Sequence, residues 1–173
     1  MIKYLKIKIK NYDKGLTLIE LLIYMGIFSI LILAMVGLLA TIFDVQLEAQ
    51  STSDVSKDGR YIVNKLTYDI NNATSASVPA VGVQGQTLVM SDGIITYTYN
   101  LQGGNLTLTN SILGTTDQLN SVNTTVSNLS FLKLSDTKSK NVNTITATFT
   151  LRSKVLQRGQ AESQNFKVTA GTR

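Results

Sequence analysis

Residues 16–43 read LTLIELLIYMGIFSILILAMVGLLATIF, an apolar run in which Glu20 is the one charged residue. At about 1.5 Å per residue, a helix over this run is roughly 42 Å long, which exceeds the hydrocarbon core of a bilayer. A secretory signal has a shorter apolar region, about 7–15 residues, followed by an A-x-A-like cleavage site. A soluble core large enough to bury such a helix would need more than the roughly 130 remaining residues. The run therefore predicts a membrane-spanning helix.

The segment before this run, residues 1–15, is basic. It holds five lysines and one acid, Asp13, and so carries four of the chain's five net positive charges. By the positive-inside rule, we expect this leader to stay on the cytoplasmic side of the membrane. The rest of the chain is close to neutral and lacks the clustered basic residues of a nucleic-acid interface. No nucleic-acid partner is expected.

The composition also bears on catalysis. Cysteine and histidine are absent, which excludes disulfides, Cys/His zinc sites, cysteine nucleophiles and histidine bases. Asp92 and Asp117 lie in predicted turns and loops, where aspartate commonly stabilises the turn itself. No calcium-loop or phosphate-loop spacing is present. We therefore expect a structural protein with no catalytic residue, metal site or cofactor.

Glu20 lies inside the apolar run, where a charge costs about 2.5–3.5 kcal/mol at the centre of a membrane helix. One interpretation is that Glu20 reaches the headgroups, favoured by the positive end of the helix dipole. However, the surrounding residues 14–23, KGLTLIELLI, resemble the prepilin-type processing motif of the type IV filament superfamily. That superfamily includes type IV pili, type II secretion pseudopili and competence pili. The resemblance covers roughly the first third of the chain.

The resemblance implies a cleavage site and a paired charge. A prepilin peptidase would cut between Gly15 and Leu16 and methylate the new N-terminus at Leu16, a position where the family usually has Phe or Met. Glu20 would then pair with the terminal amine of a neighbouring subunit. Because an unpaired buried charge is costly, this pairing would fix the register between subunits.

Small residues recur along the apolar run, among them Gly26, Gly37 and Thr41. Gly37 and Thr41 form a small-xxx-small pair that lets two helices approach closely. Ordinary transmembrane composition, in which glycine is common, accounts for the same residues equally well. We expect Gly26, Gly37 and Thr41 to contribute to helix packing.

Residues 44–73 predict an amphipathic helix that continues from the apolar run. Val55, Ile62, Leu66, Ile70 and Ala73 follow at spacings of 7, 4, 4 and 3, which places them on one face. Charged residues are expected elsewhere on the helix: Asp54, Lys57, Asp58, Arg60, Lys65 and Asp69. Gly59 interrupts the pattern and suggests a bend. The polar residues that follow the face, and then Pro79, end the helix.

Residues 74–173 predict an antiparallel β-rich head. Strands are expected at 86–90, 94–101, 106–109, 126–134, 144–151 and 165–169, with polar loops at 110–125, 135–143 and 153–164. Ser91-Asp92-Gly93 indicates a hairpin turn, and Tyr61, Tyr97 and Tyr99 are expected to be packing aromatics. The predicted fold class is α+β: a long hydrophobic helix that continues into an amphipathic helix packed on an antiparallel sheet.

The pattern from Gly59-Arg60 through Leu66 to Asp69-Ile70 and Ala73 resembles the helix of minor pilins and J-type minor pseudopilins. We therefore expect a minor pilin or pseudopilin, processed by prepilin peptidase and assembled into a type IV pilus, a type II secretion pseudopilus or a competence pseudopilus. Its expected partners are prepilin peptidase, other pilin or pseudopilin subunits, the inner-membrane assembly platform and the lipid bilayer.

The expected location follows from the same features. The chain would cross the cell membrane once, with the leader cytoplasmic and the head extracytoplasmic, and would then enter a cell-surface or periplasmic filament. The alternative is an uncleaved single-span anchor that presents the β-domain as an adhesin or receptor. DNA uptake as a competence pilin is a third interpretation, which the near-neutral head disfavours.

Overall fold

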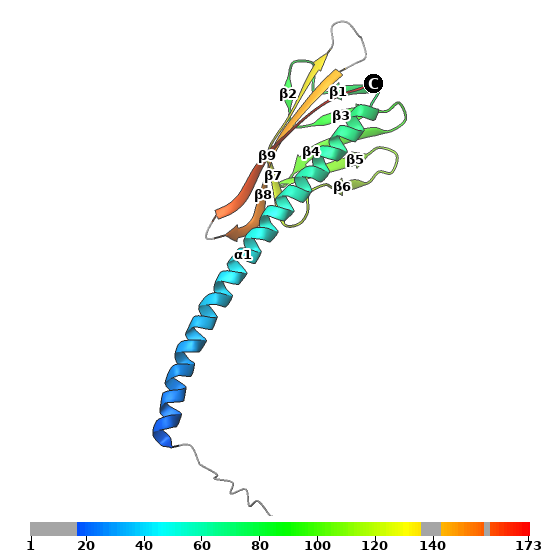
Figure 1. Ribbon diagram of the computed structural model, residues 1–173. Coiled ribbons are helices and arrows are strands. Elements are labelled where there is room, and N and C mark those ends of the chain that lie inside the picture. Colours follow the sequence, from blue (N-terminus) through cyan, green and yellow to red (C-terminus); the bar gives the residue numbers. More distant parts are fainter. Residues whose placement is uncertain (1–16, 136–142, 158–159) are drawn as a thin grey trace, which may run out of the picture. The chain divides into compact units, whose positions relative to one another are not determined.

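The computed structural model describes residues 17–135, 143–157 and 160–173, except for the side chains of residues 135 and 157. The chain divides into two compact units, Met1–Phe43 and Asp44–Arg173. The described part of the first unit is Thr17 followed by helix. The second unit holds the continuation of that helix and two β-sheets (Figure 1).

One α-helix, α1, runs from Leu18 to Asn72. Thr17 precedes it as an N-cap: the Glu20 backbone N–H donates to Thr17 Oγ1 at 3.3 Å, and the Leu21 N–H donates to the Thr17 carbonyl at 3.1 Å. A capping hydroxyl satisfies a donor that the first turn of a helix leaves without an intrahelical acceptor. The helix thus begins two residues into the apolar run, directly after its Thr17 cap.

The nine strands described in the second unit form two antiparallel sheets with the orders β1-β3-β4-β5-β6 and β2-β7-β8-β9. Their bounds are β1 Ser75–Val78, β2 Gln84–Gly85, β3 Leu88–Ser91, β4 Thr96–Gln102, β5 Asn105–Asn110, β6 Thr116–Gln118, β7 Thr124–Ser135, β8 Asn143–Gln157 and β9 Gln160–Gly171. A long apolar helix followed by antiparallel sheets confirms the predicted α+β class.

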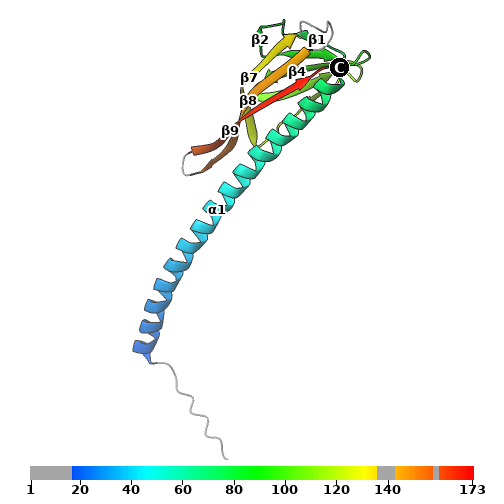
Figure 2. The ribbon, with the colours of Figure 1, turned by 45° about the horizontal axis from the view of Figure 1, so that its top comes forward.

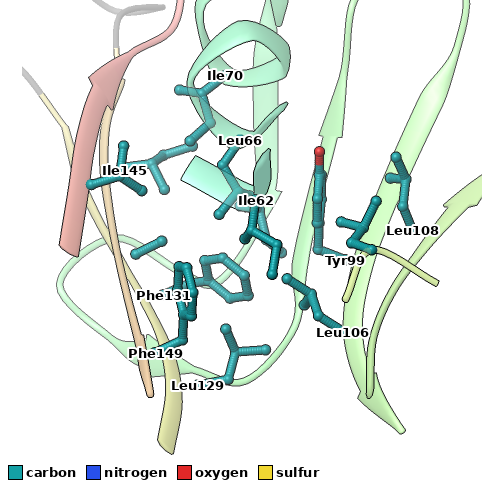
Figure 3. Close-up of a cluster of buried hydrophobic side chains, with 14 of the residues drawn as sticks. Ile62, Leu66, Ile70, Tyr99, Leu106, Leu108, Leu129, Phe131, Ile145 and Phe149 are labelled. Carbon is teal, nitrogen blue, oxygen red and sulfur yellow. The ribbon is translucent and has the colours of Figure 1, made fainter. Parts of the chain in front are cut away.

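The core of the second unit lies between α1 and both sheets (Figure 3). The expected apolar face of α1 is buried here, with Ile62, Leu66 and Ile70 fully covered. Around them pack Leu88, Tyr99 and Leu106 from the first sheet, and Phe131, Ile145 and Phe149 from the second. The prediction of an amphipathic helix with its apolar face on the β-head is therefore confirmed.

Gly59 has a packing role that the sequence did not indicate. α1 remains helical through this position, so the suggested bend does not interrupt it. Gly59 is buried, and a Cβ atom built on it would lie 2.0 Å from Cζ of Phe166 in β9. The Phe166 ring also stacks on Phe149, with 5.3 Å between ring centroids. The missing side chain makes room for this aromatic pair against the helix.

Asp69, expected away from the apolar face of this helix, is buried. It is 3% exposed, accepts a hydrogen bond from the Tyr99 hydroxyl, and accepts another from Lys65 Nζ at 2.9 Å. Burial first, and then the hydrogen bond to Asp69, raise the pKa of Tyr99 well above its ordinary value of 10.0. Tyr99 is thus a packing aromatic, as expected, and also a polar link between α1 and β4.

Two further acidic residues of α1 accept hydrogen bonds from the loop between β6 and β7 and from the start of β7. Asp58 Oδ2 accepts from the Ser121 N–H at 2.8 Å and from Thr124 Oγ1 at 2.5 Å. Asp54 Oδ2 accepts from Asn123 Nδ2 at 3.0 Å. The charge on this side of the helix therefore serves to join α1 to the segment that passes from one sheet to the other.

The hairpin turn predicted at 91–93 is present between β3 and β4. Asp92 Oδ1 accepts from the backbone N–H groups of Ile94 at 2.9 Å and Ile95 at 2.7 Å. These two bonds lower the pKa of the Asp92 carboxyl. Gly93 has φ 99°, a conformation that residues with a Cβ rarely adopt. Asp92 is therefore a turn former, as its position in the sequence suggested.

Some predicted loops are strands. The expected loop at 153–164 is largely the far end of the β8–β9 hairpin, which pairs Leu156 with Ala161 (Figure 2). The expected loop at 110–125 contains β6, and β1 and β2 were not predicted. These segments are short or polar on both faces, so the alternation typical of a half-buried strand is missing. The predicted loop at 135–143 lies mostly outside the described residues.

Candidate functional site on the apolar helix

The first part of α1 presents apolar side chains on all sides. Every described side chain from Thr17 to Gln50 is exposed, and the large hydrophobic residues between Leu18 and Phe43 are 43–77% exposed. The helix is long and apolar enough to cross a membrane. Exposed apolar patches on soluble monomers rarely exceed a few hundred Å². This surface therefore requires lipid or another protein to cover it.

Glu20 lies in the first turn of α1, where the helix dipole favours a negative charge. Its backbone N–H is held by the Thr17 cap, and its carboxylate accepts a hydrogen bond from the Tyr24 hydroxyl at 3.4 Å. The sequence analysis did not predict either partner of Glu20, Thr17 or Tyr24. The Thr-x-x-Glu spacing of a helix start and the four-residue spacing to Tyr24 are the signals that would have found them.

Gly15 and Leu16, the expected cleavage site, lie outside the described residues. Their relation to Glu20 is therefore known from sequence spacing, with Leu16 four positions before the acid. Gly15 and Leu16 remain predictions.

The small residues expected to pack against other helices are open in the described structure. A Cβ built on Gly26 or on Gly37 would meet nothing within 4 Å. Thr41 Oγ1 donates to the Gly37 carbonyl at 3.1 Å, and Ser29 Oγ donates to Met25 in the same way at 2.8 Å. These hydroxyls are satisfied within the helix, which suits a hydrocarbon environment without water.

Two sides of the apolar helix can be distinguished. At about 100° per residue, Glu20, Tyr24, Phe28 and Leu31 lie on one side, which we call the Glu20 side. Tyr24, Phe28 and Leu31, together with Met25 and Ile27, form an exposed apolar surface next to Glu20. Gly26 and Gly37 lie roughly a third of a turn away from Glu20. The acid and the two glycines therefore lie on different sides of the helix.

The second unit has a hollow of about 430 Å³ between α1 and the β8–β9 hairpin. Asp44, Glu48 and Glu162 line it together with apolar residues that include Leu156. Across the described ranges, no group of three or more acidic residues is arranged to hold a metal ion.

Comparison with known proteins identifies the start of the chain. Residues 10–36 match the family model described as the prokaryotic N-terminal methylation motif, the type IV pilin-type signal. The match spans Gly15, Leu16, Glu20 and Gly26, and it ends before the β-sheets begin. Neither the curated proteins nor the solved structures that were searched contain a match to the chain. The resemblance to a pilin-type signal is thus confirmed.

Proposed function

We propose that this chain, which carries the prokaryotic N-terminal methylation motif, is the precursor of a structural, non-enzymatic filament subunit of the type IV pilin kind. Prepilin peptidase removes residues 1–15 by cutting between Gly15 and Leu16, and Leu16 becomes the methylated N-terminus. The observation that carries the proposal is the motif at 10–36, which extends into the first part of α1, where the apolar side chains are exposed on every side.

Glu20 gives the assembled state its register. Cleavage creates an amine beside an apolar helix, and a carboxylate lies one turn along the same helix. Each charge is costly in hydrocarbon without a partner. Pairing the amine of one subunit with Glu20 of its neighbour removes both costs at one axial offset, whereas other offsets leave two uncompensated charges.

Gly26, Gly37 and Thr41 are proposed to contact other helices in the filament. The open space beside both glycines allows another backbone to approach closely, and the Thr41 hydroxyl is already satisfied within its own helix. Close approach is the main source of helix association in membranes, because lipid tails are as apolar as the side chains.

The β-head is proposed to lie outside the cytoplasm, with the leader on the cytoplasmic side before cleavage. The subunit leaves the bilayer through an inner-membrane assembly platform and joins other pilin or pseudopilin subunits in a cell-surface or periplasmic filament. A minor, low-copy position is supported by the resemblance of residues 59–73 to minor pilins. The near-neutral charge outside the leader disfavours nucleic acid as a partner.

Mass spectrometry of the mature protein, purified from the cells that produce it, tests this function. The expected N-terminus is methylated Leu16. In the variant Gly15→Val, a branched side chain obstructs the close backbone approach that glycine permits, and the leader is retained. Gly26→Ala is the matched control and is processed normally. A wild-type protein that keeps Met1 would contradict the proposal and favour an uncleaved membrane anchor that presents the β-head as an adhesin or receptor.

A further inference from the structure

Tyr24 brings a phenolic hydroxyl into the apolar run, one helical turn after Glu20. Its hydroxyl donates to Glu20 Oε1 at 3.4 Å, and its side chain is 55% exposed. Between Leu21 and Phe28 the other side chains are aliphatic, aromatic, thioether or glycine. The phenol therefore stands out in a stretch that otherwise lacks hydrogen-bonding side chains.

A carboxylate in hydrocarbon needs donors, because leaving it unsatisfied costs several kcal/mol. The Thr17 hydroxyl accepts from the Glu20 backbone, which leaves Tyr24 as the side chain seen to donate to the carboxylate in the described part of the chain. Hydrogen bonds to charged groups are stronger than those between neutral groups. The Tyr24 hydroxyl is thus placed to fix the direction of the Glu20 carboxylate.

The bond also leaves room for a second partner. A carboxylate has two acceptor oxygens with about four lone-pair sites, and Tyr24 engages one oxygen. On the same Glu20 side, the Tyr24 ring lies beside the apolar side chains of Phe28 and Leu31. Among the described residues, this side of α1 therefore presents a carboxylate oxygen that Tyr24 does not engage next to an apolar surface.

We propose that Tyr24 is a positioning residue for Glu20: its hydroxyl donates to one carboxylate oxygen and so directs the other oxygen toward the terminal amine of a neighbouring copy. This inference rests on the proposed function, because the amine exists only after the leader is removed.

The contact itself can be tested without assembly. The chain holds three glutamates, Glu20, Glu48 and Glu162, so carboxyl labelling of glutamate with carbon-13 gives three resonances for the full chain in lipid vesicles. The resonance that is missing from the spectrum of the Glu20→Gln variant is the one that belongs to Glu20. Tyr24→Phe, which removes the hydroxyl alone, is expected to shift that resonance. Tyr68→Phe, in the part of α1 that belongs to the second unit, is expected to shift none. An unchanged Glu20 resonance in Tyr24→Phe would overturn the positioning role.

The effect of Tyr24 on assembly is tested in cells that produce filaments. Tyr24→Phe is expected to leave leader removal unchanged and to lower incorporation about threefold to tenfold, the range for a polar contact between membrane helices. In a Glu20→Gln background, the same substitution is expected to cause no further loss. Normal processing with wild-type incorporation of Tyr24→Phe would show that the positioning of Glu20 by Tyr24 does not matter for assembly and would overturn the proposal there. A wild-type chain that is neither processed nor incorporated would instead overturn the proposed function, and the resonance shift would still decide the positioning role.

Discussion

Gly59 of α1 lies directly against the ring of Phe166 in β9, at a distance where a Cβ atom would come within 2.0 Å of Cζ. This contact joins the helix to the edge strand of the four-stranded sheet. Phe166 in turn stacks on Phe149, which is 2% exposed in the core. The missing side chain at one helix position thus sets how closely α1 approaches this sheet.

Gly59→Ala is therefore expected to destabilise the head by about 1–3 kcal/mol, the usual cost of overpacking, even though alanine favours a helix. Urea unfolding of the full chain in detergent micelles measures the change. Gly26→Ala is the matched control, because its new methyl group meets nothing within 4 Å. Partial recovery of stability in the double variant Gly59→Ala/Phe166→Leu is expected. A Gly59→Ala variant as stable as the wild type would show that the ring moves aside freely.

Tyr99→Phe is expected to cost about 1–3 kcal/mol of unfolding free energy. The substitution keeps the buried ring and removes the donor to Asp69, a carboxylate that is 3% exposed. Tyr61→Phe serves as the control, because Tyr61 is 55% exposed. Equal urea midpoints for the two variants would contradict a stabilising role for the Tyr99–Asp69 hydrogen bond.

The raised pKa of Tyr99 predicts a loss of stability in alkali. In the unfolded chain Tyr99 ionises near its ordinary pKa of 10.0, whereas in the folded head burial keeps it protonated. Its contribution is therefore fully present below pH 10 and declines as the pH rises above that value. Urea midpoints measured from about pH 8 to about pH 11 test this. The decline is expected to be smaller in Tyr99→Phe, and an equal decline would assign it to other groups.

Glu20→Gln is expected to lower incorporation into filaments by at least about tenfold, because the neighbour's amine would lose its counter-charge. Quantifying the subunit in sheared filaments and in membranes, with leader removal checked by mass spectrometry, separates assembly from processing. Asp117→Asn removes a charge from an exposed strand of the head and is the control. Unchanged incorporation of Glu20→Gln would show that charge pairing does not set the register.

Local and periodic signals in the sequence accounted for much of the fold. The spacing of Val55, Ile62, Leu66 and Ile70 identified the buried face of α1, since residues three or four apart share one side of a helix. Ser91-Asp92-Gly93 identified the β3–β4 hairpin, since the turn is closed by bonds within four residues. The β8–β9 extension past Arg152 was missed, because strands that reach beyond a core lose the apolar alternation.

In the candidate site, too, some residues were predicted from the sequence and others were missed. Glu20 and the apolar run were found from sequence, because an acid inside such a run is conspicuous and the motif is contiguous. Tyr24 was missed because a tyrosine near the end of a membrane helix is ordinary, and its meaning depends on the direction of its hydroxyl.

The sequence by itself determined the signal at 10–36, the long apolar helix and the α+β class, because each depends on residues adjacent along the chain or repeated at a fixed period. The tertiary structure decided that Asp69 is buried, that Asp58 holds the loop between the sheets, and that Gly59 makes room for an aromatic ring. Their partners are distant in sequence, 30 residues for Asp69 and 63 for Asp58. Whether a polar or missing side chain is tolerated inside a protein depends on which distant group folding brings against it.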